Sequence, residues 1–152
     1  MNRRIFSKLL STSFFGFFIR KTVQASEEQP NYDIKLVERN KTSYYKWING
    51  VHELHRVDGP AVEYANGDKE WHQNGQQHRL DGPAIEYKDG HKVWYQNGKL
   101  HRLDGPAIEY ASGHKEWHQN GQRHRLDGPA VEYIDGSKAW YQNGQRYRFH
   151  LS

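Results

Sequence analysis

A repeat of 23 residues governs most of the chain and limits what it can fold into. Copies of His-Arg, Asp-Gly-Pro-Ala and Glu-Tyr recur in steps of 23, beginning at 55–56, 58–61 and 63–64 and ending at 124–125, 127–130 and 132–133. A period of this length is typical of an array of identical supersecondary units, each too small to bury its apolar face alone. The repeat therefore predicts a stacked array of units over residues 44–148.

Turn signals define the unit. Asn-Gly, the strongest short-range signal for a hairpin with a type I′ turn, occurs at 49–50, 74–75, 97–98, 120–121 and 143–144. A second turn, such as Lys88-Asp89-Gly90, suits a loop that ends in a left-handed glycine. Each unit is expected to have strands at roughly 83–87 and 91–96, with the next strand beginning near Lys99. The predicted fold class is all-β, an elongated antiparallel meander of about five repeated hairpins.

These turns predict a strand register. With Asn97-Gly98 as a two-residue loop, Trp94 lies opposite His101, and the same rule places Trp47 opposite His52 although Trp47 is one residue out of phase. We interpret the first unit as one that keeps its Trp–His pair because its hairpin is shorter by one cross-strand residue pair (one rung). Around the second turn, oppositely charged residues face each other in four pairs: Glu63–Lys69, Glu86–Lys92, Glu109–Lys115 and Glu132–Lys138. Each such pair contributes on the order of 0.2–1 kcal/mol.

The register also predicts two faces. One carries Ala84, Trp94, His101 and Leu103, and the other carries Ile85, Tyr87, Val93 and Tyr95. We expect the face with the repeated tryptophans to be the core and the other face to meet a partner. The predicted partner-binding residues form one column of that second face: His72, Tyr95, His118 and Tyr141. A β-bulge would exchange the two faces.

The run from Trp94 through Asn97-Gly98 to His101 resembles the MORN repeat, whose core is Tyr-x-x-Asn-Gly-x-x-His-Gly. Here Arg102 follows the histidine, and residues 103–107, Leu-Asp-Gly-Pro-Ala, replace the usual Gly-x-Gly. The chain therefore resembles a variant MORN-like repeat over about residues 44–148. The resemblance implies an elongated single-layer sheet that serves as a scaffold for protein partners, lipid head groups or its own copy. It also implies that any catalysis resides in separate domains.

Residues 1–25 have the pattern of an export signal. They contain five basic residues and no acidic one, an apolar stretch at 9–19, and the small-residue cleavage motif Val23-Gln24-Ala25. Arg3-Arg4 resembles the bacterial twin-arginine signature, which predicts cleavage near Ala25 and a periplasmic or secreted product. A mitochondrial presequence is the alternative. This eleven-residue stretch spans about 16 Å as a helix, roughly half a bilayer core, so no permanent membrane span is expected. Residues 26–43 are assigned to a linker and first-strand region, and 149–152 to a C-terminal tail.

Charge argues against a nucleic-acid partner. The chain has 22 basic and 18 acidic residues, a formal charge of +4, but five of the basic residues lie in the leader. The remaining 17 basic residues face 18 acidic ones, so the repeat region lacks the basic excess that nucleic-acid binding needs.

Composition and spacing also argue against an active site or a metal. The chain has no cysteine, which excludes a thiolate ligand or nucleophile. Equivalent histidines such as His78, His101 and His124 lie two strands apart, about 9–10 Å. They cannot share a zinc ion, which holds its nitrogen ligands at about 2.0–2.1 Å. The acidic residues recur in every unit opposite a lysine, and the serines lack a distinctive base. We therefore expect no enzyme activity, catalytic residue, cofactor or metal.

The predicted function is that of a non-enzymatic exported scaffold or protein-interaction module. Its partner would be a protein or an envelope polymer. The alternative is a cell-wall or glycan-binding module that uses the aromatic face, since regularly spaced tryptophans and tyrosines on a sheet can stack on sugars; aromatics make up 14% of the chain. Unpaired strands at the two ends of the array would favour a homodimer.

Overall fold

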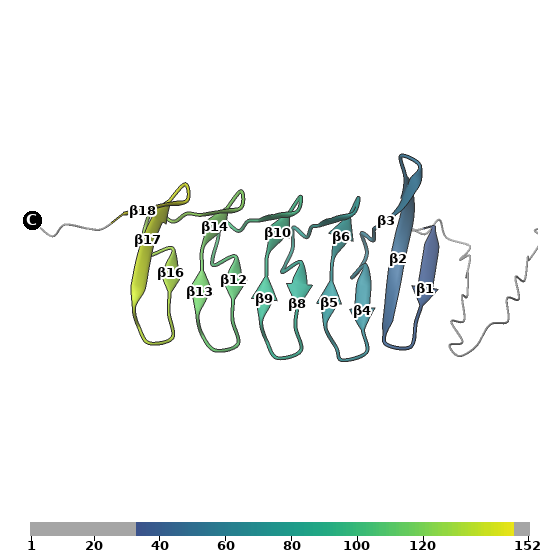
Figure 1. Cartoon of the computed structure of the whole chain (residues 1–152), viewed down its shortest axis with the longest axis horizontal. Helices are drawn as coiled ribbons and strands as arrows, with labels where there is room; N and C mark the ends of the chain where they lie inside the picture. The colour runs from purple at the N-terminus through teal and green to yellow at the C-terminus, as the bar shows by residue number, and fades with distance from the viewer. Residues whose placement is uncertain (1–32, 148–152) are drawn as a thin grey trace, which may run out of the picture.

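The structure, a computed structural model, describes residues 33–147. In that part of the chain every regular element is a β-strand, and successive units follow one another along the long axis of the molecule (Figure 1). The all-β class and the antiparallel meander are therefore confirmed. No helix in the described residues is long and apolar enough to cross a membrane. The predicted leader and C-terminal tail lie outside the described residues.

One large antiparallel sheet runs through all units, and three short hairpins accompany it. The sheet contains β1 (Ile34–Val37), β2 (Lys41–Ile48), β3 (Val51–Leu54), β4 (Val62–Tyr64), β5 (Lys69–Glu70), β8 (Ile85–Glu86), β9 (Lys92–Val93), β12 (Ile108–Glu109), β13 (Lys115–Glu116), β16 (Val131–Glu132), β17 (Lys138–Gln142) and β18 (Gln145–Tyr147). The separate hairpins are β6 (His72–Gln73) with β7 (Gln76–Gln77), β10 (Tyr95–Gln96) with β11 (Lys99–Leu100), and β14 (His118–Gln119) with β15 (Gln122–Arg123).

The predicted turns and register are confirmed. The asparagines of the five hairpin turns have φ between 48° and 52°, and each following glycine also has positive φ, as a type I′ turn requires. Gly90 of the second turn has φ 93°. Gln96 pairs with Lys99 and Trp47 with His52, as expected.

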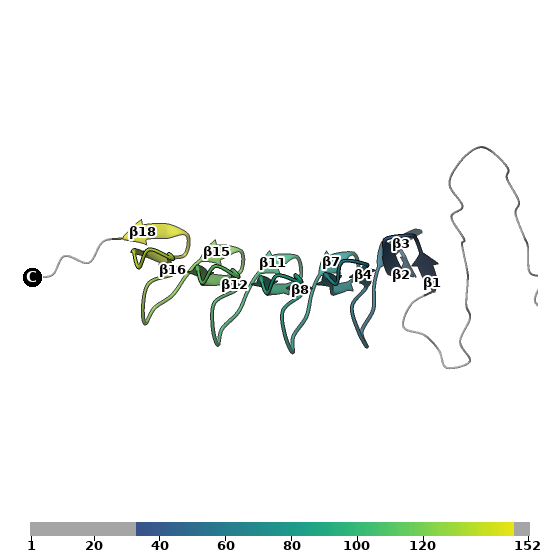
Figure 2. The same ribbon diagram turned by 90° about the horizontal axis from the view of Figure 1, so that it is seen from below.

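The predicted strand over residues 91–96 is divided at Trp94. The backbone N–H of Trp94 donates to Ala107 O in the main sheet, and its carbonyl accepts from His101 N–H in the hairpin. Trp71, Trp94 and Trp117 therefore mark the points at which the chain leaves the sheet and enters a separate hairpin, whereas Trp140 lies within the continuous strand β17. Figure 2 shows the hairpins as a second row beside the sheet strands.

The assignment of core and surface to the two faces is wrong for three of the assigned residues, although Ala84 is buried and Tyr87 is exposed as expected. Ile85 and Val93, placed on the partner face, are buried, whereas Leu103, placed on the core face, is 75% exposed. One continuous row of cross-strand neighbours contains buried and half-buried side chains: Val62, Glu70, Ile85, Val93, Ile108, Glu116, Val131 and Ala139. Neighbouring side chains in this row cover one another, while Trp71, Trp94 and Trp117 are covered by arginines, as described below.

The row next to it alternates in charge. Glutamates and lysines follow one another across the strands in the order Glu63, Lys69, Glu86, Lys92, Glu109, Lys115, Glu132 and Lys138. The four predicted cross-strand pairs are therefore present. Within residues 33–147, however, the ion pairs of these glutamates are formed with Arg56, Arg79, Arg102 and Arg125 and not with the lysines.

The first unit differs from the prediction. Tyr44, not Trp47, occupies the place of the repeated tryptophan, because its N–H donates to Ala61 O and its carbonyl accepts from His55 N–H. The hairpin is longer at its tip than the later ones, so the prediction of a lost rung is wrong. Trp47 lies beyond this position, is 57% exposed, and makes an edge contact with the His52 ring at 4.6 Å between centroids.

Candidate functional site

The arginine of each His-Arg pair clamps a loop and covers an aromatic ring. The guanidinium carbon of Arg79 lies 4.0 Å from the centre of the Trp71 ring, within the range of a cation–π contact. Arg79 Nε donates to Asp81 at 2.9 Å, and Nη1 donates to Pro83 O at 3.2 Å and to Glu86 at 2.8 Å. The same contacts recur at Arg56, Arg102 and Arg125, over the rings of Tyr44, Trp94 and Trp117.

The clamp explains nearly every position of the repeated motif. A Cβ on Gly82 would lie 2.9 Å from Arg79 Cζ, so a larger residue would displace the guanidinium from its place in the clamp. Ala84 is completely buried, which excludes a larger side chain. The aspartate, the proline carbonyl and the glutamate each accept a hydrogen bond from the arginine. The residue between arginine and aspartate is the exception.

That remaining position forms an exposed apolar row. Val57, Leu80, Leu103 and Leu126 are 58%, 75%, 75% and 73% exposed. Each unit adds two strands to the sheet, so successive members lie about 9–10 Å apart. We call this set the loop row. The fold buries none of these four side chains, so their apolar surface is exposed to solvent.

Acidic side chains border the loop row. Asp81, Asp104 and Asp127 follow its three leucines, and a hydrogen bond from the neighbouring arginine lowers the pKa of each carboxyl group. They are therefore ionised at neutral pH, and each charge is compensated by its arginine. An apolar centre with a polar border is the anatomy of a protein-binding surface.

The predicted partner-binding residues lie on the buried side of the hairpins. His72 and His118 are each 7% exposed, and Tyr95 and Tyr141 are half-buried. The four residues do occupy one column on successive hairpins, because each carbonyl accepts a bond from the arginine N–H of the preceding unit. Burial raises the pKa of Tyr95. The predicted column is thus brought together, but it faces the inside of the fold.

A buried carboxylate holds the inner face of one unit. Glu116 Oε2 lies 2.9 Å from His118 Nε2 and accepts from Arg123 Nε at 3.0 Å, while Oε1 lies 3.1 Å from His114 Nε2. The hydrogen bond from His118, with those from Arg123 and His114, keeps the pKa of Glu116 far below its ordinary value against the opposing effect of burial. Such a saturated, ionised carboxylate is suited to holding side chains in place and unsuited to proton transfer at neutral pH.

Glu70 holds the equivalent place two units earlier. Its carboxylate lies 2.9 Å from His72 Nε2 and accepts from the Tyr64 hydroxyl at 3.1 Å. The hydrogen bond from His72 is the main reason that the pKa of Glu70 is lowered. The acid–histidine pair is therefore a recurring device and not a singular centre.

Aromatic rings also follow one another along the array. The centroids of Tyr87, His91, Tyr110, His114 and Tyr133 are separated in turn by 4.8, 4.6, 4.8 and 5.0 Å. Tyr87, Tyr110 and Tyr133 are 40%, 37% and 41% exposed, so the stack is open to solvent along one side.

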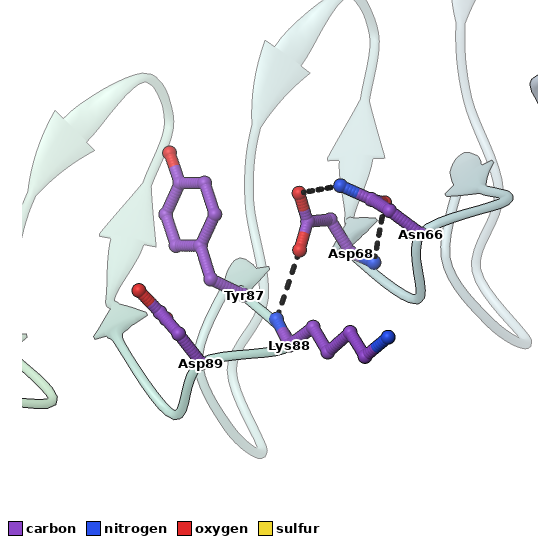
Figure 3. Close-up of a pocket in the computed structure, with 5 residues that line it drawn as sticks. All are labelled: Asn66, Asp68, Tyr87, Lys88 and Asp89. Atoms are coloured by element: carbon purple, nitrogen blue, oxygen red, sulfur yellow. Dashed lines mark hydrogen bonds between the residues drawn. The ribbon is translucent and has the colours of Figure 1, made fainter.

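A depression of about 470 Å³ lies between the turns of two neighbouring units. Figure 3 shows Asp68 beside Asn66 and the backbone of Lys88, with Tyr87 and Asp89 on the other side. Asp68 accepts from Asn66 Nδ2 at 2.7 Å and from Lys88 N–H at 2.8 Å. Through these two bonds the Asp68 carboxylate joins the turns of neighbouring units, so the residues that line the depression hold the units together.

Within residues 33–147, no three histidine, aspartate or glutamate side chains are placed to hold a metal ion together. Comparisons of the chain with protein-family models, curated proteins and solved structures found no match. The structure thus shows an array of repeated antiparallel hairpins compatible with a MORN-like repeat.

Proposed function

We propose that this chain is a non-enzymatic interaction module that binds a protein partner along the loop row. The observation that supports the proposal is the exposure of Val57, Leu80, Leu103 and Leu126, which take no part in a motif whose other positions are all used by the fold. Four apolar side chains at even spacing in the loops beside an extended sheet suit an elongated partner with a matching apolar stripe. We further propose that the units are variant MORN-like repeats.

The proposed site of action is the bacterial envelope. The support is the basic and apolar leader at residues 1–25 with its small-residue motif ending at Ala25. Determination of the N-terminus of the protein isolated from an envelope fraction would test this, with Ser26 as the expected first residue. A product that retains residue 1 would overturn cleavage.

The test of partner binding compares two triple variants. Leu80→Ser, Leu103→Ser and Leu126→Ser together remove the apolar side chains of the loop row. Lys69→Ser, Lys92→Ser and Lys115→Ser together are the matched control, because these lysines are also exposed and repeated. We expect a protein cross-linked to the wild-type chain in envelope extract to be lost with the leucine variant and retained with the lysine variant. Equal retention by both would contradict binding through the loop row.

Glycan binding is the second candidate, and the solvent-open ring stack of Tyr87, Tyr110 and Tyr133 is the feature that favours it. Against it, the rings of Trp71, Trp94 and Trp117 are each covered on one side by a guanidinium. A panel of wall glycans would decide: binding that is lost with Tyr110→Ser and kept with the leucine variant supports this function over the first.

A further inference from the structure

The five Asn-Gly hairpin turns share one backbone conformation. The φ angles of Asn49, Asn74, Asn97, Asn120 and Asn143 are 48°, 52°, 50°, 52° and 49°. Any difference in their chemical behaviour must therefore come from their surroundings and not from the turn itself.

Four of these turns are fastened to the preceding unit. Gly98 N–H donates to Gln77 O at 3.0 Å, and Asn97 N–H donates to His78 Nδ1 at 3.1 Å. The same His78 nitrogen lies 2.8 Å from Asn97 Oδ1. Equivalent bonds from the glycine and the asparagine N–H groups hold the turns at 74–75, 120–121 and 143–144, where the histidines are His55, His101 and His124.

The first turn lacks these contacts. Among residues 33–147, no neighbour accepts from Gly50 N–H or contacts the Asn49 carboxamide, because no unit of the described array precedes this hairpin. A Cβ placed on Gly50 would meet nothing within 4 Å, whereas one on Gly75 would lie 3.0 Å from Glu53. Asn49 and Gly50 are exposed, as are the asparagines and glycines of the later turns, so the turns differ in their hydrogen bonds and not in their exposure.

Asn-Gly is the dipeptide most open to a reaction within the chain itself. The glycine nitrogen attacks Cγ of the asparagine carboxamide, a C–N bond forms, and the carboxamide C–NH₂ bond breaks. The amide nitrogen leaves as ammonia with the proton from the glycine N–H, and the product is a five-membered succinimide. Water then opens the ring at either carbonyl to give aspartate or isoaspartate. Apart from this water, the reaction needs no other reactant.

The hydrogen bonds of the later turns oppose this reaction twice. They occupy the glycine N–H that must become the nucleophile, and they tie the backbone N–H of the asparagine to a histidine of the preceding unit. We propose that Asn49 is a site of spontaneous modification in this protein, converted through a succinimide to aspartate and isoaspartate, and that stacking protects Asn74, Asn97, Asn120 and Asn143. The modification adds a negative charge to the hairpin that carries the exposed Trp47.

Peptide mapping of the full chain after incubation at mildly alkaline pH tests the proposal. Asn49 is expected to convert at least about tenfold faster than Asn97 or Asn120, which corresponds to about 1.4 kcal/mol in activation free energy. In urea the five rates should converge, because all five sites have glycine next. Equal rates in the folded protein would overturn the proposal, as would faster conversion at Asn97.

A variant isolates the role of the histidine contact. His78→Ala should raise the conversion rate of Asn97 severalfold while Asn120, still beside His101, keeps its wild-type rate. An unchanged rate at Asn97 would overturn the protective role of His78. If the variant unfolds, all five sites will accelerate together, and the order of rates in the folded wild-type chain then decides the proposal.

Discussion

Two kinds of unit alternate along one backbone. The acidic units carry Glu70 with His72 and Glu116 with His118 on the inner face, and the apolar units carry Val93 with Tyr95 and Ala139 with Tyr141. The arginine clamp is the same in both kinds, with the guanidinium of Arg102 over Trp94 and that of Arg125 over Trp117 at 4.0 and 4.1 Å. The clamp and the turns therefore determine the backbone. The inner face of a unit accepts either a charged network or apolar packing, provided that all the side chains of that network or packing are present together.

The largest expected effect comes from mixing the two kinds. Val93→Glu places a carboxylate in an apolar unit, where His91 Nε2 is a buried group without a partner and Leu100 stands where Arg123 would be needed. We expect a loss of about 3 kcal/mol in the free energy of unfolding, because a poorly paired charge is buried. Chemical denaturation would measure it.

The matched control adds the remaining side chains of an acidic unit to the Val93→Glu variant. Val93→Glu with Tyr95→His and Leu100→Arg converts the apolar unit into a copy of the acidic one. This triple variant should regain most of the stability lost by Val93→Glu alone. A triple variant no more stable than the single one would contradict the idea that complete sets are interchangeable.

The next effect concerns the acidic network. Glu116→Gln should lower the free energy of unfolding by about 2 kcal/mol at neutral pH, since hydrogen bonds to a charged group are replaced by weaker ones. The folded-state pKa of Glu116 lies below the unfolded value of about 4.3. The contribution of Glu116 to the free energy of unfolding is therefore complete above about pH 5 and declines as the pH falls below that.

Thermal unfolding as a function of pH would show this difference. The wild-type melting temperature should fall steeply below about pH 5, and Glu116→Gln should show a shallower fall because one carboxylate with a lowered pKa is absent. The slope that remains reflects Glu70 among others, whose pKa is shifted in the same direction. Parallel curves for the two proteins would refute the assignment.

A smaller difference in the free energy of unfolding is expected between variants of His114 and His91, the two histidines of the ring stack. His114→Ser removes a bond to Glu116, whereas His91→Ser removes only ring contacts. Serine is accommodated at this position, as Ser137 shows. We expect His114→Ser to cost about 1 kcal/mol more than His91→Ser in urea unfolding. Equal costs would mean that the bond to Glu116 adds nothing.

The smallest effect is expected at the loop row. Leu103 lies in the loop after an apolar unit and Leu126 in the loop after an acidic unit, and both side chains are largely exposed. The two variants are Leu103→Ser and Leu126→Ser. Each variant should unfold within about 0.5 kcal/mol of the wild type. A larger loss in either would show that the leucine supports the fold and is not reserved for a partner.

Turns and register could be predicted because they are local. Asn-Gly sets the hairpin geometry, and the same rule, applied to Asn49-Gly50, places His55 opposite Tyr44 and so contained the correct position of the first aromatic ring. The faces could not be predicted from alternation. A periodic pattern does not show that Arg79 reaches over Trp71 and seven residues along to Glu86.

The candidate surface was missed for a related reason. Leucine at 80, 103 and 126 lies in a loop of glycine, proline and charged residues, and its repetition there was the available signal. The burial of His72 and His118 depends on a carboxylate two residues earlier on the same face, which becomes visible only when the division of the strand at the tryptophan is known.

The junctions between units have an evolutionary consequence. Arg102 N–H donates to His118 O and Gly121 N–H to Leu100 O, and two earlier boundaries and one later boundary repeat these bonds with their own residues. A gene that gained or lost 46 nucleotide triplets by recombination would still encode neighbours that fit, with the alternation of charged and apolar interiors intact. The molecule can thus change its length in steps of two units, whereas the gain or loss of a single triplet would disturb the boundaries of the unit in which it falls.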